Sequence, residues 1–224
     1  AEYTIADTRS SRNAAPSSTR HDPTVVIAHG IRSGKLPHIG LAVAPEEARA
    51  TLAARKHLDE IGPQELLFHF DPLAGHGSAA LEDFSAITKI HRGRSTLEIV
   101  LPCRRSAAVE LNEIAAQTGA AGFQPHSVTV SPAVDRQSTP PGSVWPTCPP
   151  LDEVYEAARL AFPHVRLGGG MLSYFTELNR KRVPANRLDF ITHCTNPIVH
   201  ASDDRSVMQT LEALPFITKS VRGI

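Results

Sequence analysis

The chain has 224 residues, which is long enough to bury a sizeable core and to form a single α/β domain. Hydrophobic residues make up 41% of it and charged residues 21%, proportions that are ordinary for a folded soluble protein. Its 23 basic and 23 acidic residues cancel, so no net charge draws it to nucleic acid or to an anionic membrane. We therefore expect a small or weakly charged partner.

The three cysteines, Cys103, Cys148 and Cys194, are odd in number and lack CxxC spacing. This pattern argues against both a disulfide framework and a structural zinc site. No stretch approaches the roughly twenty apolar residues of a membrane helix, and no basic-then-apolar signal segment opens the chain. We therefore expect a reducing compartment, the cytoplasm.

In chain order, residues 1–37 are rich in Ser, Arg, Ala and Pro, which predicts an irregular lead-in with a possible short strand at 24–30. Residues 38–224 predict one barrel-like domain in which strands alternate with helices. Such alternation indicates the α/β class, with parallel strands and right-handed crossovers. Strands are expected at 39–44, 65–70, 96–102, 127–131, 165–170 and 188–193, and helices at 46–61, 78–90, 106–119, 151–162, 172–181 and from about 203.

Side-chain alternation within these strands favours a (β/α) TIM-barrel-like fold over an open doubly wound sheet. In each strand, every second side chain is bulky and apolar, as in Leu66, Phe68 and Phe70, and this set (the bulky parity) should face the helices. The side chains between them, which point to the opposite face, are small or polar, and this suits a barrel interior with a site at its mouth. A complete barrel needs eight units. With about six βα units, the chain predicts an incomplete barrel, a fragment, or a barrel whose missing strands come from elsewhere.

Parity also selects polar side chains at the carboxyl ends of strands, where barrel enzymes place their chemistry. His69, Asp71 and His193 lie there. The pair His69 and Asp71 would suit acid/base catalysis or metal ligation. Barrel metallohydrolases usually add a matching ligand pair on the first strand, but this sequence has Ala42 and Ala44 there, so we expect neither a metal nor a cofactor.

A second polar set, Glu98, Arg166 and Asp189, lies near the starts of the predicted strands. A buried charge needs a partner. We expect these three side chains to form a structural ion network at the end of the barrel away from the site.

The most concentrated polar stretch runs from residue 165 to 203. Glu177 can act as a general base if its surroundings raise its pKa, or it can merely cap or solvate a short helix. Arg180 can bind a substrate carboxylate or simply face water, and the histidines can transfer protons or only satisfy hydrogen bonds. Candidate catalytic residues here are Glu177, His193 and His200, and candidate substrate-binding residues are Tyr174, Asn179, Arg180 and Asn196.

Within that stretch, the segments GGGMLSYFTELNRKRVP (168–184) and THCTNPIVHASDDRSVMQTLEALP (192–215) resemble the D-apionate lactonase family. Its members are sugar-acid lactone hydrolases of bacterial apiose catabolism, and they are longer than this chain, with the barrel-like part as one portion. The resemblance is strongest from Gly168 to Pro215 and extends back to about Ile39. It implies hydrolysis of the lactone of a branched sugar acid, such as D-apionolactone, to the open acid.

For this reaction we distribute roles among the candidate residues by their chemistry. Glu177, with His69 or Asp71, activates water; His193 or His200 polarises the carbonyl or protonates the leaving alkoxide; Asn179 and Arg180 orient the substrate. Two alternatives stay open: a clan-A-like glycoside hydrolase, with Glu177 as one of two facing carboxylates, or a non-catalytic carbohydrate-binding barrel fragment.

Overall fold

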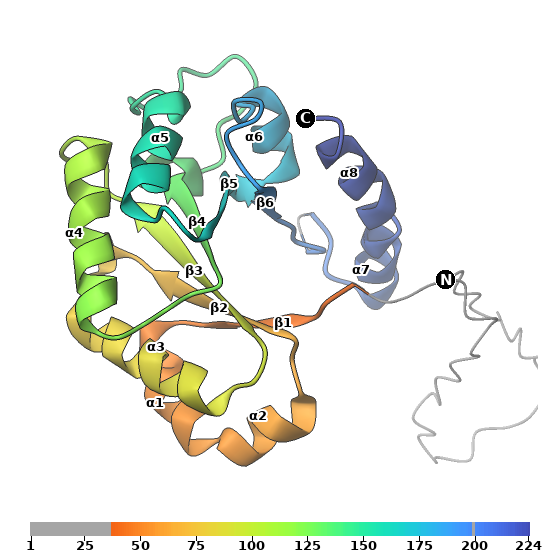
Figure 1. Ribbon diagram of the computed structural model, residues 1–224. Coiled ribbons are helices and arrows are strands. Elements are labelled where there is room, and N and C mark those ends of the chain that lie inside the picture. The colour runs from red at the N-terminus through yellow and green to blue at the C-terminus, as the bar shows by residue number, and fades with distance from the viewer. Residues whose placement is uncertain (1–36, 199) are drawn as a thin grey trace, which may run out of the picture. The chain divides into compact units, whose positions relative to one another are not determined.

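The computed structural model describes residues 37–198 and 200–224, in which six parallel strands alternate with helices (Figure 1). The strands lie side by side in chain order in one sheet, and each pair of neighbours is parallel. All six predicted strands are present. Their bounds are β1 Gly40–Val43, β2 Glu65–Phe70, β3 Arg94–Leu101, β4 Ser127–Pro132, β5 Arg166–Tyr174 and β6 Phe190–Cys194.

The helices follow the strands as predicted, with three differences. The expected helix at 172–181 begins only at Phe175, because β5 continues to Tyr174. The expected helix at 46–61 is divided at Ala54 into α1 and α2, and Gly62 ends α2 in the left-handed conformation with φ 58°. The expected last helix is also divided, because Pro215 starts a new one. The bounds are α1 Pro45–Ala53, α2 Arg55–Ile61, α3 Ser78–Ile90, α4 Ala107–Ala120, α5 Leu151–Ala161, α6 Phe175–Arg180, α7 Asp204–Leu211 and α8 Leu214–Val221, with short 3-10 helices η1 Pro72–Ala74 and η2 Ala133–Arg136.

The predicted lead-in, with its possible strand at 24–30, lies outside the described residues, so the division of the chain at residue 37 stays a prediction. Among the helices that are described, none is long and apolar enough to cross a membrane.

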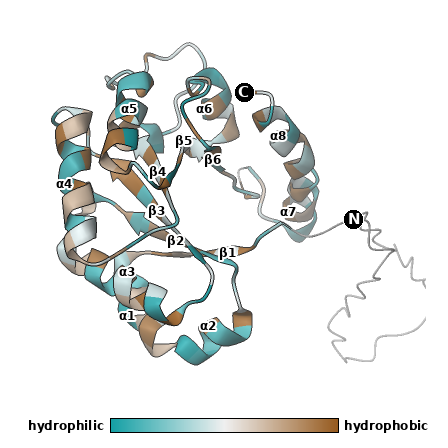
Figure 2. Ribbon diagram, in the orientation of Figure 1, coloured by the Kyte–Doolittle hydropathy of each residue, from teal (hydrophilic) through white to brown (hydrophobic). Residues whose placement is uncertain are grey.

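The core lies between the sheet and the helices, on the face that the bulky strand parity predicted. Leu66, Phe68 and Phe70 of β2 are at most 1% exposed. Phe68 packs against Phe84 of α3 and Phe123, with ring centroids 4.7 and 5.4 Å away. Figure 2 shows hydrophobic residues along the central strands and a mostly hydrophilic α2. Burying each large apolar side chain contributes about 1.5–3 kcal/mol, which fixes the inner and outer faces of the sheet.

Strand β6 departs from the predicted parity. A Cβ added at Gly168 of β5 would overlap the Phe190 ring, so this ring lies over Gly168. Thr192, two residues further along β6, lies 3.2 Å from Thr129 of β4 (Oγ1 to Oγ1). Phe190 and Thr192 therefore occupy the inner face. The prediction that the bulky side chains of each strand face the helices is therefore wrong for Phe190 of β6, because glycine in β5 leaves room for a bulky ring on the inner face.

Gly170→Ala is expected to destabilise the fold by about 2–4 kcal/mol. Gly170 has φ +153°, and an added Cβ would overlap the backbone carbonyl of Thr192, which is held by strand pairing. The matched control is Gly119→Ala in α4, where an added Cβ meets nothing within 4 Å. Because Ala is the better helix former, this control should gain about 0.5–1 kcal/mol. Denaturant unfolding measures both, and equal stabilities would contradict the packing described for β5.

Candidate active site

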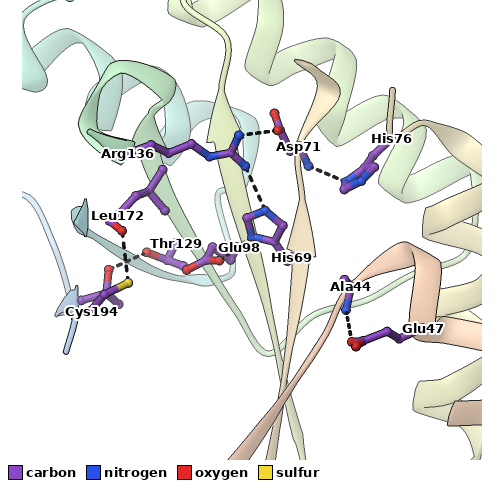
Figure 3. A network of polar contacts seen from close by, with 11 residues as sticks. Ala44, Glu47, His69, Asp71, His76, Glu98, Thr129, Arg136, Leu172 and Cys194 are labelled. Atoms are coloured by element: carbon purple, nitrogen blue, oxygen red, sulfur yellow. Dashed lines mark hydrogen bonds and ion pairs between the residues drawn. The ribbon is translucent and has the colours of Figure 1, made fainter. Parts of the chain in front are cut away.

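The parallel register places polar side chains in one row on the inner face of the sheet. His69 of β2 lies opposite Glu98 of β3, and Glu98 lies opposite Thr129 of β4. Residues at matching positions of neighbouring strands point to the same face, so these side chains are neighbours (Figure 3). The His69 Nδ1 atom lies 2.7 Å from Glu98 Oε2, and the contact between Thr129 and Thr192 extends the row to β6.

Arg136, at the end of η2, joins this row to the end of β2. Its Nη2 atom lies 3.1 Å from His69 Nε2, and its Nη1 atom lies 2.7 Å from Asp71 Oδ2 (Figure 3). The Asp71 side chain is only 1% exposed and also accepts a hydrogen bond from the Leu73 N–H at 2.9 Å. Asp71 therefore anchors one arm of the guanidinium, while the other arm contacts His69.

These contacts determine the tautomer of His69. A guanidinium only donates hydrogen bonds, so His69 Nε2 must be the acceptor and Nδ1 must carry the proton. The Nδ1–H then donates to the Glu98 carboxylate, which orients the ring. A neutral imidazole held by a carboxylate, with its second nitrogen unprotonated, is the arrangement of a general base. The side chains of His69 and Arg136 are 29% and 43% exposed, so water and a small molecule can reach both.

The predicted ion network of Glu98, Arg166 and Asp189 is wrong for Glu98. Glu98 is the fifth of eight residues in β3, which starts two residues before the predicted strand, and it pairs with His69. Asp189 does have a structural role, because it accepts the Leu167 N–H at 2.7 Å. This hydrogen bond, together with Arg159, lowers the pKa of Asp189. The Arg166 guanidinium lies over the Phe190 ring, 5.4 Å from its centroid.

Glu177 lies in a separate cluster at the start of α6. Its carboxylate is buried and accepts hydrogen bonds from Ser138 and Thr176, both at 2.7 Å, and from Arg180 at 2.8 Å. Burial raises the pKa of Glu177, but these donors outweigh it and hold the pKa below its usual value. The base role predicted for Glu177 depends on a raised pKa, so this direction favours the alternative in which Glu177 supports its helix, and the base role stays a prediction. Arg180 Nη2 also donates to the Thr139 carbonyl at 2.6 Å, so this nitrogen is engaged within the protein.

Glu177→Gln is therefore expected to cost about 1–3 kcal/mol of stability, because it leaves Arg180 without its carboxylate partner. Since the folded-state pKa of Glu177 is lowered, its contribution is present above the unfolded pKa of about 4.3 and is lost as the pH falls through the folded value. The variant should thus lose more stability, relative to the wild type, at pH 7 than at pH 3.

The matched control is Glu113→Gln. Glu113 pairs with Arg105 through side chains that are 50% and 54% exposed, and such surface pairs are worth about 0–1 kcal/mol. Denaturant unfolding of both variants at the two pH values measures the difference. A Glu177→Gln variant as stable as the control at pH 7 would contradict the structural role.

The remaining predicted residues have contacts or exposure other than in the row of His69, Glu98, Thr129 and Thr192, which we call the His69 row. His193 points away from the inner face, since Thr192 occupies it, and its ring packs edge-on against Phe175, 6.1 Å between centroids. The inward position predicted for His193 is wrong. Tyr174 and His200 are exposed, Asn179 accepts a hydrogen bond from Arg182 at 3.0 Å, and Asn196 accepts the Ile198 N–H at 2.8 Å.

Glu98, Arg136 and the threonine pair were not among the sequence-derived candidates. Glu98 has the same parity as the polar residues that were chosen, so correct strand bounds would have recovered it. For Arg136 the sequence carries no comparable signal, because its reach to β2 depends on how η2 packs. Among the residues that the structure describes, no three His, Cys, Asp or Glu side chains converge as metal ligands.

A pocket of about 300 Å³ lies outside the His69 row. It is lined by residues of the segment after β2, including Leu73 and His76, and by Glu110 and Ile114 of α4. Neither His69 nor Glu177 lines it. We place the candidate site on the inner face because His69, Arg136 and two carboxylates contact one another there, beside the carboxyl end of β2.

Comparison with known proteins assigns the chain to a family. Residues 39–224 match the family described as D-apionate lactonase, TIM barrel domain. The chain belongs to this family. The family resemblance and the TIM-barrel-like fold predicted from the sequence are thereby confirmed, and the six parallel strands are consecutive units of such a barrel.

Among curated proteins, the D-apionate lactonase of Brucella anthropi is 61% identical over 220 residues, which cover 98% of this chain and 36% of that protein. The chain thus spans about a third of the length of this relative. Among solved structures, an enolase from Bradyrhizobium, crystallised with magnesium and mandelic acid, aligns with a TM-score of 0.41 and 14% identity over 70% of this chain and 38% of its own.

Proposed function

We propose that the protein to which this chain contributes hydrolyses the lactone of a branched sugar acid, such as D-apionolactone, to the open-chain acid in carbohydrate catabolism. The observation that carries the proposal is 61% identity to a D-apionate lactonase over nearly the whole chain. The site on the inner face supports it, because ester hydrolysis needs a base for water and a donor for the carbonyl oxygen. The cytoplasm stays the expected compartment.

In the proposed mechanism, His69 Nε2 removes a proton from the attacking water. The lactone enters with its carbonyl oxygen at Arg136 Nη2. This new hydrogen bond replaces the contact between Arg136 and His69, so His69 Nε2 becomes free. The water oxygen then bonds to the carbonyl carbon, and the guanidinium stabilises the resulting oxyanion. As the intermediate collapses, the ring C–O bond breaks and the protonated His69 donates its proton to the leaving alkoxide.

The neighbouring side chains position these two groups. Glu98 holds the Nδ1–H of His69 and stabilises the imidazolium, and Asp71 holds the first arm of Arg136. The hydroxyl of half-buried Thr192, which contacts buried Thr129, supplies a donor and an acceptor for a sugar hydroxyl group on the same face. Direct roles for His193, His200, Tyr174, Asn179 and Asn196 stay predictions, as do those of Glu177 and Arg180. Glu177 and Arg180 also hold Ser138 and Thr139 in the loop between η2 and α5.

The test compares three substrate classes with the full-length protein: D-apionolactone, an unbranched sugar lactone and an aryl glycoside. We expect acid release, followed by pH-stat titration, to be fastest with the branched lactone and to fall in His69→Gln. Hydrolysis of the aryl glycoside without lactone opening would favour a glycoside hydrolase. Thermal stabilisation by sugar lactones without any turnover would favour a carbohydrate-binding module.

A further inference from the structure

We propose that His76 is a positioning residue for lactone hydrolysis, because it orients Asp71, which in turn orients Arg136. The inference rests on the proposed function, in which Arg136 binds the carbonyl oxygen. His76 lies in the short segment between η1 and α3, and its side chain is only 7% exposed. A polar ring that is buried to this extent needs hydrogen-bond partners, and the partners of this ring lead to the site.

His76 closes the turn that follows β2. Its Nδ1 atom accepts the Asp71 N–H at 2.9 Å, and its own backbone N–H donates to the Asp71 carbonyl at 3.2 Å (Figure 3). One residue therefore holds the backbone of Asp71 at both its N–H and its carbonyl group. The ring also packs edge-on against the ring of His69, with 6.2 Å between the centroids.

These contacts determine the tautomer of His76. A backbone N–H only donates, so His76 Nδ1 must be the acceptor and Nε2 must carry the ring proton. The Nε2–H then donates to Glu46 Oε1 of α1 at 3.1 Å. This tautomer is the opposite of the one at His69, where Nδ1 carries the proton. Both ring nitrogens of His76 are occupied within the protein, so its role is to position other groups and not to contact the substrate.

The orientation of Asp71 decides where Arg136 points. Asp71 turns Oδ1 toward the Leu73 N–H at 2.9 Å and Oδ2 toward Arg136 Nη1 at 2.7 Å. The second arm of the same guanidinium reaches His69 Nε2 at 3.1 Å. Without the Nδ1 acceptor, the turn at Asp71 should shift and misplace the guanidinium. Such a shift weakens stabilisation of the transition state more than it weakens substrate binding.

Two substitutions of His76 separate the Nδ1 acceptor from the rest of the ring. In His76→Asn, the side-chain oxygen lies near the position of Nδ1 and can still accept the Asp71 N–H. In His76→Gln, the amide lies near the position of Nε2 and leaves that N–H unpaired. With the full-length protein and D-apionolactone, we expect His76→Gln to lower kcat by about 10- to 100-fold with little change in KM, and His76→Asn to keep kcat within about threefold of the wild type. Equal losses of kcat in the two variants would overturn the proposal.

The matched control is His91→Gln. His91 also joins two backbone segments, because its Nε2–H donates to the Pro63 carbonyl at 2.9 Å, but it precedes β3 at the opposite end of the sheet. Its kcat should stay near the wild-type value. A loss as large as that of His76→Gln would show that the kinetic effect comes from general disturbance of the fold, and it would contradict the positioning role.

A double variant tests whether His76 acts through the guanidinium. If it does, His76→Gln combined with Arg136→Lys should be little slower than Arg136→Lys alone, because the misplaced group is already absent. If the two losses of kcat multiply, His76 acts independently of Arg136, and the proposal is wrong.

Hydrogen exchange of the full-length protein, followed by mass spectrometry, tests the contact without a substrate. The Asp71 amide should exchange about tenfold faster in His76→Gln than in the wild type, and at nearly the wild-type rate in His76→Asn. Unchanged exchange in His76→Gln would overturn the proposal whatever the kinetics show. A wild-type protein that opens no lactone would instead remove the proposed function, while the exchange rates would still decide whether His76 holds Asp71.

Discussion

Replacing His69 with Gln is expected to lower kcat for lactone opening by about 10²- to 10⁴-fold, with a much smaller change in KM. Glutamine fills a similar space but cannot take a proton from water near neutral pH. The measurement is steady-state kinetics of the full-length protein with D-apionolactone. His57→Gln, at an exposed position of α2, is the control and should leave kcat unchanged.

A double-mutant cycle with Glu98→Gln separates catalysis from packing. The two side chains are 2.7 Å apart and act as a unit, so the double variant should be little slower than His69→Gln alone. If the two losses simply multiplied, Glu98 would act independently of His69. If the His69→Gln variant kept the wild-type kcat, His69 could not be the general base.

Arg136→Lys is expected to reduce kcat by about 10²-fold with little loss of stability. Lysine keeps the charge next to buried Asp71, but its single ammonium cannot hold Asp71 and also reach the carbonyl oxygen, as the planar guanidinium does. Arg136→Met removes the charge as well, and it should cost about 1–3 kcal/mol because Asp71 loses its partner. Kinetics and denaturant unfolding measure the two effects separately.

The control for this pair of variants is Arg187→Lys. Arg187 pairs with Asp152 through side chains that are 47% and 59% exposed, so both kcat and stability should stay near the wild-type values. If Arg136→Lys turned over the lactone as fast as this control, the guanidinium would have no role in stabilising the oxyanion.

The local geometry of a strand made much of the fold predictable. Successive side chains point to opposite faces, so the apolar series Leu66, Phe68 and Phe70 identified the face that packs on the helices, and it placed His69 on the other. The same reasoning failed at β6, where Phe190 occupies the inner face over Gly168. In that case the identity of a residue on the neighbouring strand, rather than the strand's own pattern, decided the orientation.

The sequence by itself determined the α/β class, the six strands, the family and the inward positions of His69 and Glu98, because these depend on patterns within short segments. The tertiary structure decided which side chains meet. Register between β2 and β3 brought Glu98 to His69, the packing of η2 brought Arg136 to both His69 and Asp71, and the loop before α5 brought Ser138 to Glu177. Register and loop packing are set by contacts between residues far apart in the chain, and no local period encodes them.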